Sequence, residues 1–239
     1  MVKRRRTTRK RSPLFKKLDI VFEDKDLLIV NKPAGLLAVP IPGSRVKNLR
    51  DLLNDFLRSR KQKAIIVHRI DRYTSGLMVF AKNQPAHAHL VKQFLAHTPT
   101  RIYLALVRGR MESPEGELRH YLKLTTHGFR QVVVASEKQG GTLAITRYRV
   151  LKELHEASLL EVQLITGLKN QIRVQLTAAG HPIIGDRHYA PEEKKEKAID
   201  HQALHAYRLG FVHPRTGEYV EFTAEPPADF LRVQQELEE

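Results

Sequence analysis

The 239-residue sequence contains no cysteine. This absence excludes structural disulfides, thiolate zinc sites and a cysteine nucleophile. No apolar run approaches the roughly 18 residues that a bilayer-spanning helix needs, and the first residues lack the apolar segment of a secretory signal. We therefore expect a cytoplasmic protein without a membrane segment.

Motifs for nucleotide cofactors are also missing, because the chain has neither a G-x-x-x-x-G-K-[ST] loop nor a G-x-G-x-x-G turn. His87 and His89 lie in a polar helical stretch without a matching carboxylate and second ligand group at metal spacing, so we interpret them as surface residues. Ser75, His68 and Asp71 do not form a convincing nucleophile triad, since "YTSG" is not a G-x-S-x-G elbow. No cofactor and no metal is predicted.

Acidic residues are few beside basic ones. The chain has 41 Lys and Arg against 26 Asp and Glu, a formal charge of +15, which predicts a polyanionic partner. Nine of the basic residues precede the first acid, Asp19, and we predict that residues 1–18 form a disordered tail that contacts phosphates. A nuclear-import patch, a transit peptide and a free solvated tail are the alternatives for this segment. A membrane surface is disfavoured, because no strongly amphipathic helix accompanies the charge.

Hydrophobic patterning predicts mixed α and β structure in which strands dominate and a few helices lie on them. No long Gly, Ser or Pro linker divides residues 19–239, which we interpret as a single domain. The predicted strands are 19–24, 27–33, 76–83, 101–109 and 158–166, the predicted helices are 48–60, 86–97 and 171–180, and a hairpin is predicted over 204–222. The charged segment 191–202 is expected to be an exposed loop or a short helix.

Asp71 is the candidate that raises a functional question. It stands in "IIVHRIDRYTSGLMVF", between Arg69 and Arg72 and between two apolar runs typical of buried strands. An acid at the end of a strand often pairs with a neighbouring arginine and serves folding alone. Position by itself therefore leaves both a structural and a catalytic role open.

Five segments together resemble one enzyme family. The stretch "VHRIDRYTSGLMVFAKN" resembles the H-R-L-D-x-x-T-S-G signature of the RluA-type pseudouridine synthases, with Ile70 in place of the usual leucine. Four further segments agree in order: "IVNKPAGLLAVP", "RIYLALVRG", "GLKNQIRVQLTAAGHPIIGDRHY" and "LHAYRLGFVHPRTGEYVEFTAEPP". The resemblance spans roughly residues 19 to 230. It implies a catalytic domain of the pseudouridine synthase type, with an α+β fold in which a mixed, largely antiparallel central sheet has flanking helices and loops.

The resemblance also implies roles for individual residues. Asp71 would attack or assist breakage of the uridine N-glycosidic bond, after which the uracil turns and its C5 joins C1′ of the same ribose. Arg173 would keep the Asp71 carboxylate ionised in an apolar pocket. Tyr103 would pack on the flipped uracil and take the C5 proton, although a tyrosine on a strand is by itself more typical of a core. One carboxylate is then enough, whereas a glycoside hydrolase needs two.

RNA contacts are implied for two arginines. Arg69 would fill the gap left by the extruded base or contact a phosphate, and Arg72 would extend a basic track along the same edge. The chain departs from the family's G-R-T-H-Q-I-R-V-H-L at Lys169, Asn170 and Gln175, which affects substrate choice more than chemistry.

The leading hypothesis is an RNA pseudouridine synthase that acts as a monomer on ribosomal or transfer RNA without a cofactor. The alternatives are a non-catalytic RNA-binding or ribosome-assembly protein on the same fold and a nucleoside or sugar hydrolase. A pure binder would need only the positive charge, and a hydrolase would need a second acid.

Overall fold

One sheet organises the chain. The structure is a computed structural model that describes residues 18–41, 43, 46–125, 130–190 and 199–239. Within these ranges eleven strands join in the order β1-β2-β4-β10-β5-β9-β8-β6-β7, with β3 added beside β4 and β11 beside β10. All pairings are antiparallel except that of β4 with β10. The α+β class and the largely antiparallel sheet predicted from the sequence are confirmed.

The elements have the following bounds. The strands are β1 Asp19–Glu23, β2 Leu27–Lys32, β3 Ile65–Ile66, β4 Ser75–Ala81, β5 Thr100–Arg108, β6 Glu115–Leu124, β7 Gln131–Val134, β8 Thr142–Leu154, β9 Ala157–Leu164, β10 Leu204–Val212 and β11 Tyr219–Thr223. The α-helices are α1 Leu49–Leu57, α2 Gln84–Leu95, α3 Gln171–Ala178 and α4 Ala228–Glu236, and two 3-10 turns cover Arg58–Arg60 and Glu137–Gln139.

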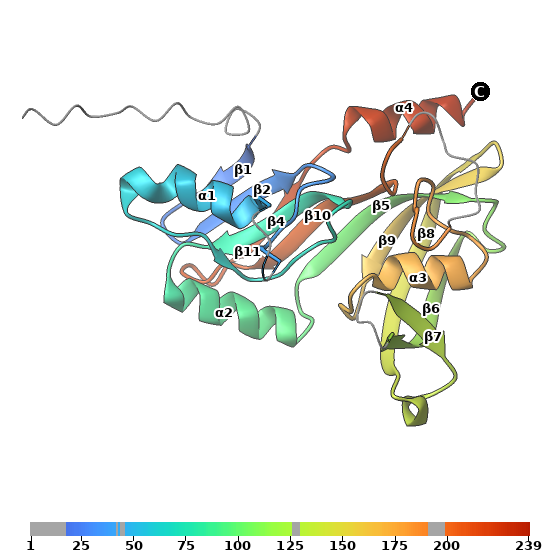
Figure 1. Ribbon diagram of the computed structural model, residues 1–239, viewed down its shortest axis with the longest axis horizontal. Coiled ribbons are helices and arrows are strands. Elements are labelled where there is room, and N and C mark those ends of the chain that lie inside the picture. Colours follow the sequence, from blue (N-terminus) through green and yellow to red (C-terminus); the bar gives the residue numbers. More distant parts are fainter. Residues whose placement is uncertain (1–17, 42, 44–45, 126–129, 191–198) are drawn as a thin grey trace, which may run out of the picture.

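Helices cover both faces of the sheet at β2 and β4, and this explains why these strands are continuous apolar runs. Leu28 of β2 belongs to the apolar cluster that includes Leu53 of α1, whereas the neighbouring Leu27 packs in the cluster that includes Leu90 of α2. The side chain of Asn48 caps α1, and that of Asn83 caps α2. Figure 1 shows α1 and α2 flanking this half of the sheet.

The other half of the sheet carries α3 and contains the strands that sequence patterning missed. Strands β6 and β8 have many charged, exposed positions, so their apolar alternation is weak, and β7 is a strand of only four residues, QVVV. Val174 of α3 packs against Leu122 of β6 and Ala144 of β8, and Figure 1 shows α3 alongside these strands. Helix α3 ends before Gly180, whose positive φ of 84° confirms the predicted helix stop.

Two predicted segments, the basic tail and the charged segment 191–202, lie mostly outside the described residues. The basic tail, residues 1–18, lies outside the described residues except for Leu18. Of the charged segment 191–202, residues 191–198 also lie outside them. In the described remainder Ile199, His201 and Gln202 are buried, with His201 paired to Asp229 and Gln202 donating to Thr74, so the predicted exposure is wrong at these three positions. None of the helices in the described ranges combines the length and apolar character needed to cross a bilayer.

Candidate active site

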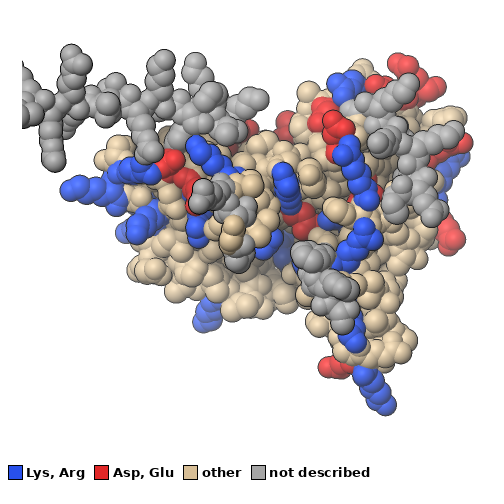
Figure 2. Space-filling model, in the orientation of Figure 1, with Lys and Arg blue, Asp and Glu red and all other residues tan. Residues whose placement is uncertain are grey.

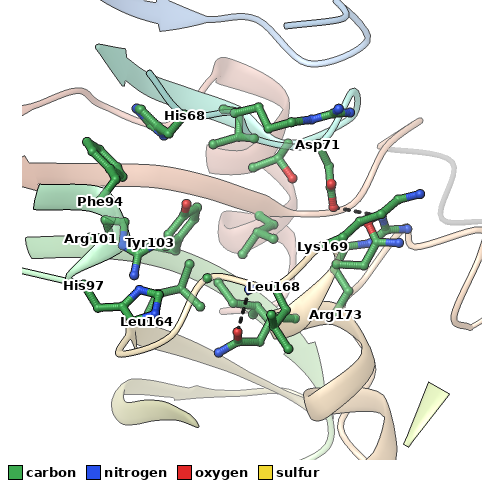
Figure 3. A pocket seen from close by; sticks show the side chains of 18 of the residues that line it. His68, Asp71, Phe94, His97, Arg101, Tyr103, Leu164, Leu168, Lys169 and Arg173 are labelled. Atoms are coloured by element: carbon green, nitrogen blue, oxygen red, sulfur yellow. Dashed lines mark hydrogen bonds and ion pairs between the residues drawn. The ribbon is translucent and has the colours of Figure 1, made fainter. Parts of the chain in front are cut away.

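A cavity of about 520 Å³ opens at the middle of the sheet, and we call it the central cavity. Its walls come from the loop 67–74 before β4, the end of α2, strand β5, and residues 167–173 at the start of α3 (Figure 3). Asp71 is the only carboxylate among the described residues that line it. Sequence positions 71, 103 and 173, all singled out above, therefore meet at one site.

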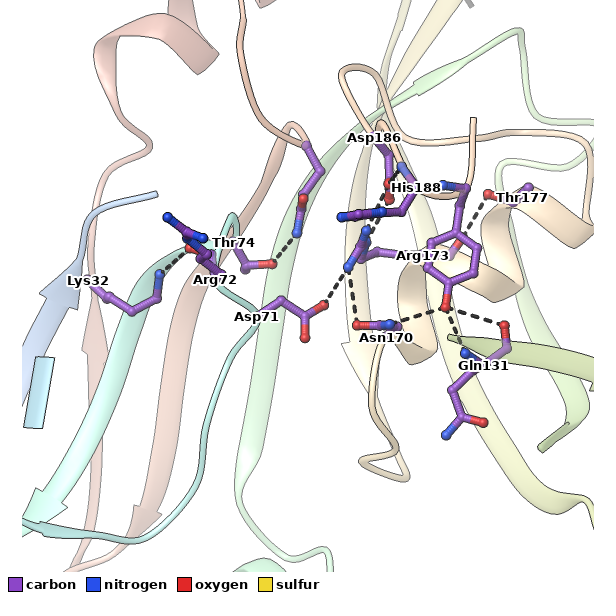
Figure 4. A network of polar contacts seen from close by, with 12 residues as sticks. Lys32, Asp71, Arg72, Thr74, Gln131, Asn170, Arg173, Thr177, Asp186 and His188 are labelled. Carbon is purple, nitrogen blue, oxygen red and sulfur yellow. Dashed lines mark hydrogen bonds and ion pairs between the residues drawn. The ribbon is translucent and has the colours of Figure 1, made fainter. Parts of the chain in front are cut away.

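Arg173 joins two carboxylates from different segments (Figure 4). Its Nη1 donates to Oδ2 of Asp71 at 3.0 Å, while Nε and Nη2 donate to the two carboxylate oxygens of Asp186 at 2.6 and 2.8 Å. The Asp186 side chain is 1% exposed, whereas that of Asp71 is 24% exposed. Asp186 thus holds the arginine, and Asp71 faces the cavity.

The charges of Arg173 and Asp186 stabilise one another. Burial opposes ionisation of both groups, but the hydrogen bond and charge of Asp186, together with the charge of Asp71, raise the pKa of Arg173 above its ordinary value. The same pairing, aided by amide donors from His188 and Tyr189, lowers the pKa of Asp186. Arg173 therefore presents a permanent positive charge to Asp71.

The backbone around Asp71 is fixed from behind. The ammonium of Lys32 is fully buried and donates to the carbonyls of Pro33, Leu36 and Arg72, each at 2.9 Å. Burial lowers the pKa of Lys32 to about 7, although the nearby charge of Asp71 acts in the opposite direction. The turn that carries Asp71 is thereby tied to the turn at residues 33–36.

Gly76, at the start of β4, permits the close crossing of β4 and β10. A Cβ at this position would lie 2.4 Å from the carbonyl oxygen of Ala206. The backbone φ of 112° is also one that residues other than glycine rarely adopt. The glycine of the "YTSG" stretch is therefore required by strand packing directly behind the Asp71 turn.

Tyr103 projects from β5 into the cavity and is 8% exposed. Burial raises the pKa of its phenol to about 12, the charge of Arg101 opposes this, and that of Asp71 adds to it. The hydroxyl is thus protonated at neutral pH, so it can accept a proton only as it gives up its own. Figure 3 shows Tyr103 between Asp71 and Arg101.

The two arginines beside Asp71 differ in their surroundings. Arg69 is exposed at the cavity and makes no hydrogen bond or ion pair with the described part of the chain. Arg72 is also exposed, but its Nε donates to the carbonyl of Gly35 at 2.9 Å and its guanidinium lies 5.2 Å from the Tyr73 ring centroid. Arg69 is the freer cation of the two.

Lys169, Asn170 and Gln175, three of the positions at which the chain departs from the family motif, lie in different surroundings. Lys169 and Asn170 line the cavity, and Oδ1 of Asn170 accepts from Nη1 of Arg173 at 3.1 Å. Gln175 is instead buried between α3 and the sheet, where its side chain bonds Thr146 and the carbonyl of Leu118. Gln175 therefore serves packing, and only the other two can contact a substrate.

Sequence reasoning did not single out Asp186, Lys32, His68 or Arg101 as site residues. Asp186 lay within a quoted segment, but nothing local indicated that it would meet Arg173. His68 and Arg101 line the cavity, and burial lowers the pKa of His68 to about 3. No group of three or more His, Cys, Asp or Glu in the described ranges is arranged to hold a metal ion.

Several known proteins are similar to this chain over most of its length. Residues 26–178 match the family described as RNA pseudouridylate synthase. Ribosomal large subunit pseudouridine synthase D of Zymomonas mobilis is 39% identical over 224 residues, which cover 89% of this chain and 70% of that protein. The uncharacterized RNA pseudouridine synthase YlyB of Bacillus subtilis is 40% identical over 230 residues, covering 92% and 73% of the two chains.

A solved structure shares the fold. The chain superposes on human RNA pseudouridylate synthase domain containing 1 with a TM-score of 0.73 and 26% sequence identity, over 89% of this chain and 85% of the human one.

Proposed function

The chain belongs to the RNA pseudouridylate synthase family, and we propose that it modifies ribosomal RNA with Asp71 as the reacting carboxylate. It is an isomerase that converts uridine in RNA to pseudouridine. The alternative of a non-catalytic RNA-binding protein receives no support from the comparisons.

The pairing of Asp71 with Arg173 carries the proposal for Asp71. A carboxylate in a largely apolar cavity stays ionised only with a compensating cation, and Arg173 supplies that charge from 3.0 Å. Asp186 accepts hydrogen bonds from Nε and Nη2, along a different edge of the guanidinium from the Nη1 bond to Asp71. Arg173 is therefore held in place whether or not Asp71 has reacted. The Asp71 carboxylate is thus free to attack C1′ of the ribose or to assist departure of the base.

The absence of a second acid among the described cavity residues fits isomerisation rather than hydrolysis. A glycoside hydrolase uses one carboxyl group to protonate the leaving group and another to act on water or sugar. Asp186, the acid on the other side of Arg173, is 1% exposed and fully engaged with Arg173 and with backbone amides.

We assign Tyr103 to the base. Its ring forms a wall of the cavity between Asp71 and the end of α2, where an extruded uracil can stack on it. The phenol, which its raised pKa keeps protonated, would take the C5 proton while giving its own to water, and N1 of the turned uracil gains a proton from water, so that the protons balance.

Positively charged side chains on the surface support RNA as the partner. Figure 2 shows Lys and Arg side chains over both halves of the sheet on the face viewed. Flipping a nucleotide out of its stack costs a few kcal/mol. Arg69, exposed at the cavity, is placed to occupy the gap that the flipped nucleotide leaves. Arg72 would contact the adjacent backbone. Since one chain supplies every wall of the cavity, action as a monomer is proposed.

The substrate class comes from the relatives. The Zymomonas mobilis protein is named a large-subunit ribosomal enzyme, and we extend that class to this chain, with transfer RNA as the alternative outcome. Pseudouridines should be mapped in ribosomal and transfer RNA from a deletion strain, and again after return of the wild-type gene or of Asp71→Asn. Loss of a ribosomal site that only the wild type restores is expected. Restoration by Asp71→Asn would refute the role of Asp71, and loss confined to transfer RNA would refute the ribosomal substrate.

A further inference from the structure

Arg101 is a buried cation in the central cavity, and no acid among the described residues pairs with it. Its side chain projects from β5 on the same face as that of Tyr103, because residues two apart on a strand share a face. It is 9% exposed and lines the cavity. Its Nη2 donates to the carbonyls of Thr166 at 3.1 Å and Ile165 at 3.5 Å, while its buried Nε has no partner within the described ranges.

The surroundings of Arg101 contrast with those of Arg173. Arg173 has two carboxylate partners, whereas no ion pair among the described residues includes Arg101. Burial lowers the pKa of Arg101, yet a guanidinium stays protonated at neutral pH. A buried charge with only carbonyl partners is costly to keep, and a bound ligand that supplies electron-rich oxygen would compensate it.

Nearby groups leave Arg101 room to act on a ligand. The glycine at position 167 leaves space for the guanidinium, because a Cβ there would lie 2.5 Å from Nη1 of Arg101. His68 stacks on Phe94 with 4.4 Å between ring centroids, and its Nε2 accepts from the amide of Val79 at 3.1 Å. Burial and the charge of Arg101 keep His68 neutral, with a pKa of about 3, so His68 places no second positive charge beside Arg101.

The order of side chains across the cavity sets what Arg101 would meet. Tyr103 lies between Asp71 and Arg101 (Figure 3). A uracil stacked on Tyr103 with its glycosidic bond at Asp71 therefore directs its opposite edge toward Arg101. In uridine the ring atom opposite N1 is C4, which bears a carbonyl oxygen. After the base has turned to place C5 at C1′, the opposite atom is C2, which also bears a carbonyl oxygen.

We propose that Arg101 reads the uracil base, donating to O4 before the base turns and to O2 afterwards, and stabilises the negative charge that the base carries between these two states. The proposal rests on the proposed function of Asp71, because it takes the orientation of the base from that assignment. A guanidinium only donates hydrogen bonds, and both O4 and O2 are acceptors. The same donor can therefore bond the base in either orientation.

The electron balance of the step supports a cation at this position. When the C1′–N1 bond breaks, its electron pair stays with the uracil and the charge spreads over N1, O2 and O4. Bond formation from C5 to C1′ consumes that charge, and the base is then completed by loss of the C5 proton and gain of a proton at N1. Charge develops only while the base is detached, so a fixed cation beside O2 or O4 favours this stage over the starting state.

Base selectivity follows from the same contact. Cytosine bears an amino group at C4, which would place a donor against the guanidinium and leave both unpaired. Sites built to bond one polar group discriminate strongly against an analogue that lacks it.

The test combines variants of Arg101 with changes at single atoms of the RNA. Stem-loop RNAs containing the mapped target uridine would carry uridine, 4-thiouridine or 2-thiouridine at that position, since sulfur is a poorer hydrogen-bond acceptor. Wild type, Arg101→Gln, Arg101→Lys and the surface control Arg232→Gln on α4 would be compared by single-turnover rates after checking folding in urea. If Arg101→Gln does not fold, Arg101→Met, which has no donor to offer the base, takes its place in the comparison.

We expect Arg101→Gln to slow the uridine reaction by about 100-fold, the effect of removing one donor from developing charge. Each thio substitution should slow the wild type and Arg232→Gln by about tenfold but add little to Arg101→Gln, because that variant has no guanidinium to donate to the altered atom. If the penalties multiply instead, Arg101 does not touch the base and only supports residues 165–166.

A binding measurement separates this inference from the assignment of Asp71. In the Asp71→Asn background, affinity for the uridine stem-loop should exceed that for the 4-thiouridine stem-loop only when Arg101 is present. Turnover by Asp71→Asn would refute the role of Asp71 and leave the Arg101 contact standing. Equal preference for uridine with and without Arg101 would overturn the Arg101 contact alone.

Discussion

Asp71 and Asp186 both pair with Arg173, but we expect their charges to matter for different properties: that of Asp186 for stability and that of Asp71 for activity. Asp186 is 1% exposed and accepts two hydrogen bonds from Arg173, so Asp186→Asn breaks a buried ion pair. Breaking such a pair destabilises a protein by about 3–5 kcal/mol, and the value should lie near the lower limit because Asp71 still pairs with Arg173.

Asp71→Asn should affect stability little. The Asp71 side chain is 24% exposed and accepts one hydrogen bond from a guanidinium that Asp186 already neutralises. The change in the free energy of unfolding should therefore stay within about 1 kcal/mol of zero.

Activity should show the reverse order. Asp71→Asn removes the reacting group and should abolish pseudouridine formation. Asp186→Asn changes no residue that lines the cavity, but it loosens Arg173, and misplacement of a positioning group by about 1 Å costs roughly 100-fold in rate.

Both variants can be measured by urea unfolding and by release of tritium from RNA labelled at C5 of uridine, under conditions in which each is folded. Equal destabilisation by Asp71→Asn and Asp186→Asn would refute the division of roles between the two acids. Measurable turnover by Asp71→Asn would refute it as well.

Three other perturbations test separate parts of the molecule. Tyr103→Phe keeps the ring, so stability should fall little while turnover measured by tritium release slows or stops; a wild-type rate would leave only the ring with a role. Burial lowers the pKa of His205 to about 4 in the folded protein. Because the unfolded chain takes up this proton near pH 6.5, the contribution of neutral His205 to the free energy of unfolding is present above pH 6.5 and is lost as the pH falls toward 4, about 3 kcal/mol in total. Urea unfolding of His205→Gln should accordingly show a smaller loss of stability over that interval, and an equal loss would contradict the assignment. Removing residues 1–18 should weaken RNA binding and flatten the slope of log K against log salt by about 0.7 for each phosphate that the tail neutralises, with the single-turnover rate at saturating RNA unchanged. An unaltered slope would mean that this segment does not touch RNA.

Local patterns in the sequence were enough for the fold class and for half of the sheet. Strands β2 and β4 are continuous apolar runs, and α1 has an apolar stripe with an asparagine cap, features that depend on residues a few positions apart. Strands β6 and β8 escaped prediction because their pairing, not their hydrophobicity, holds them in the sheet.

For the site, the sequence determined which residue types were available, namely one acid in a signature turn, a tyrosine on a strand and an arginine on a helix. The family resemblance also implied that Arg173 would serve Asp71, whereas the pairing of Arg173 with Asp186 came only from the tertiary structure. Asp71 and Arg173 are 102 residues apart in the chain, and they meet because the order of strands places the start of α3 against the loop before β4. Local periodicity carries no information on that order. For the same reason the sequence shows that Arg101 is a cation, but only the fold shows that it is buried with no acid beside it among the described residues.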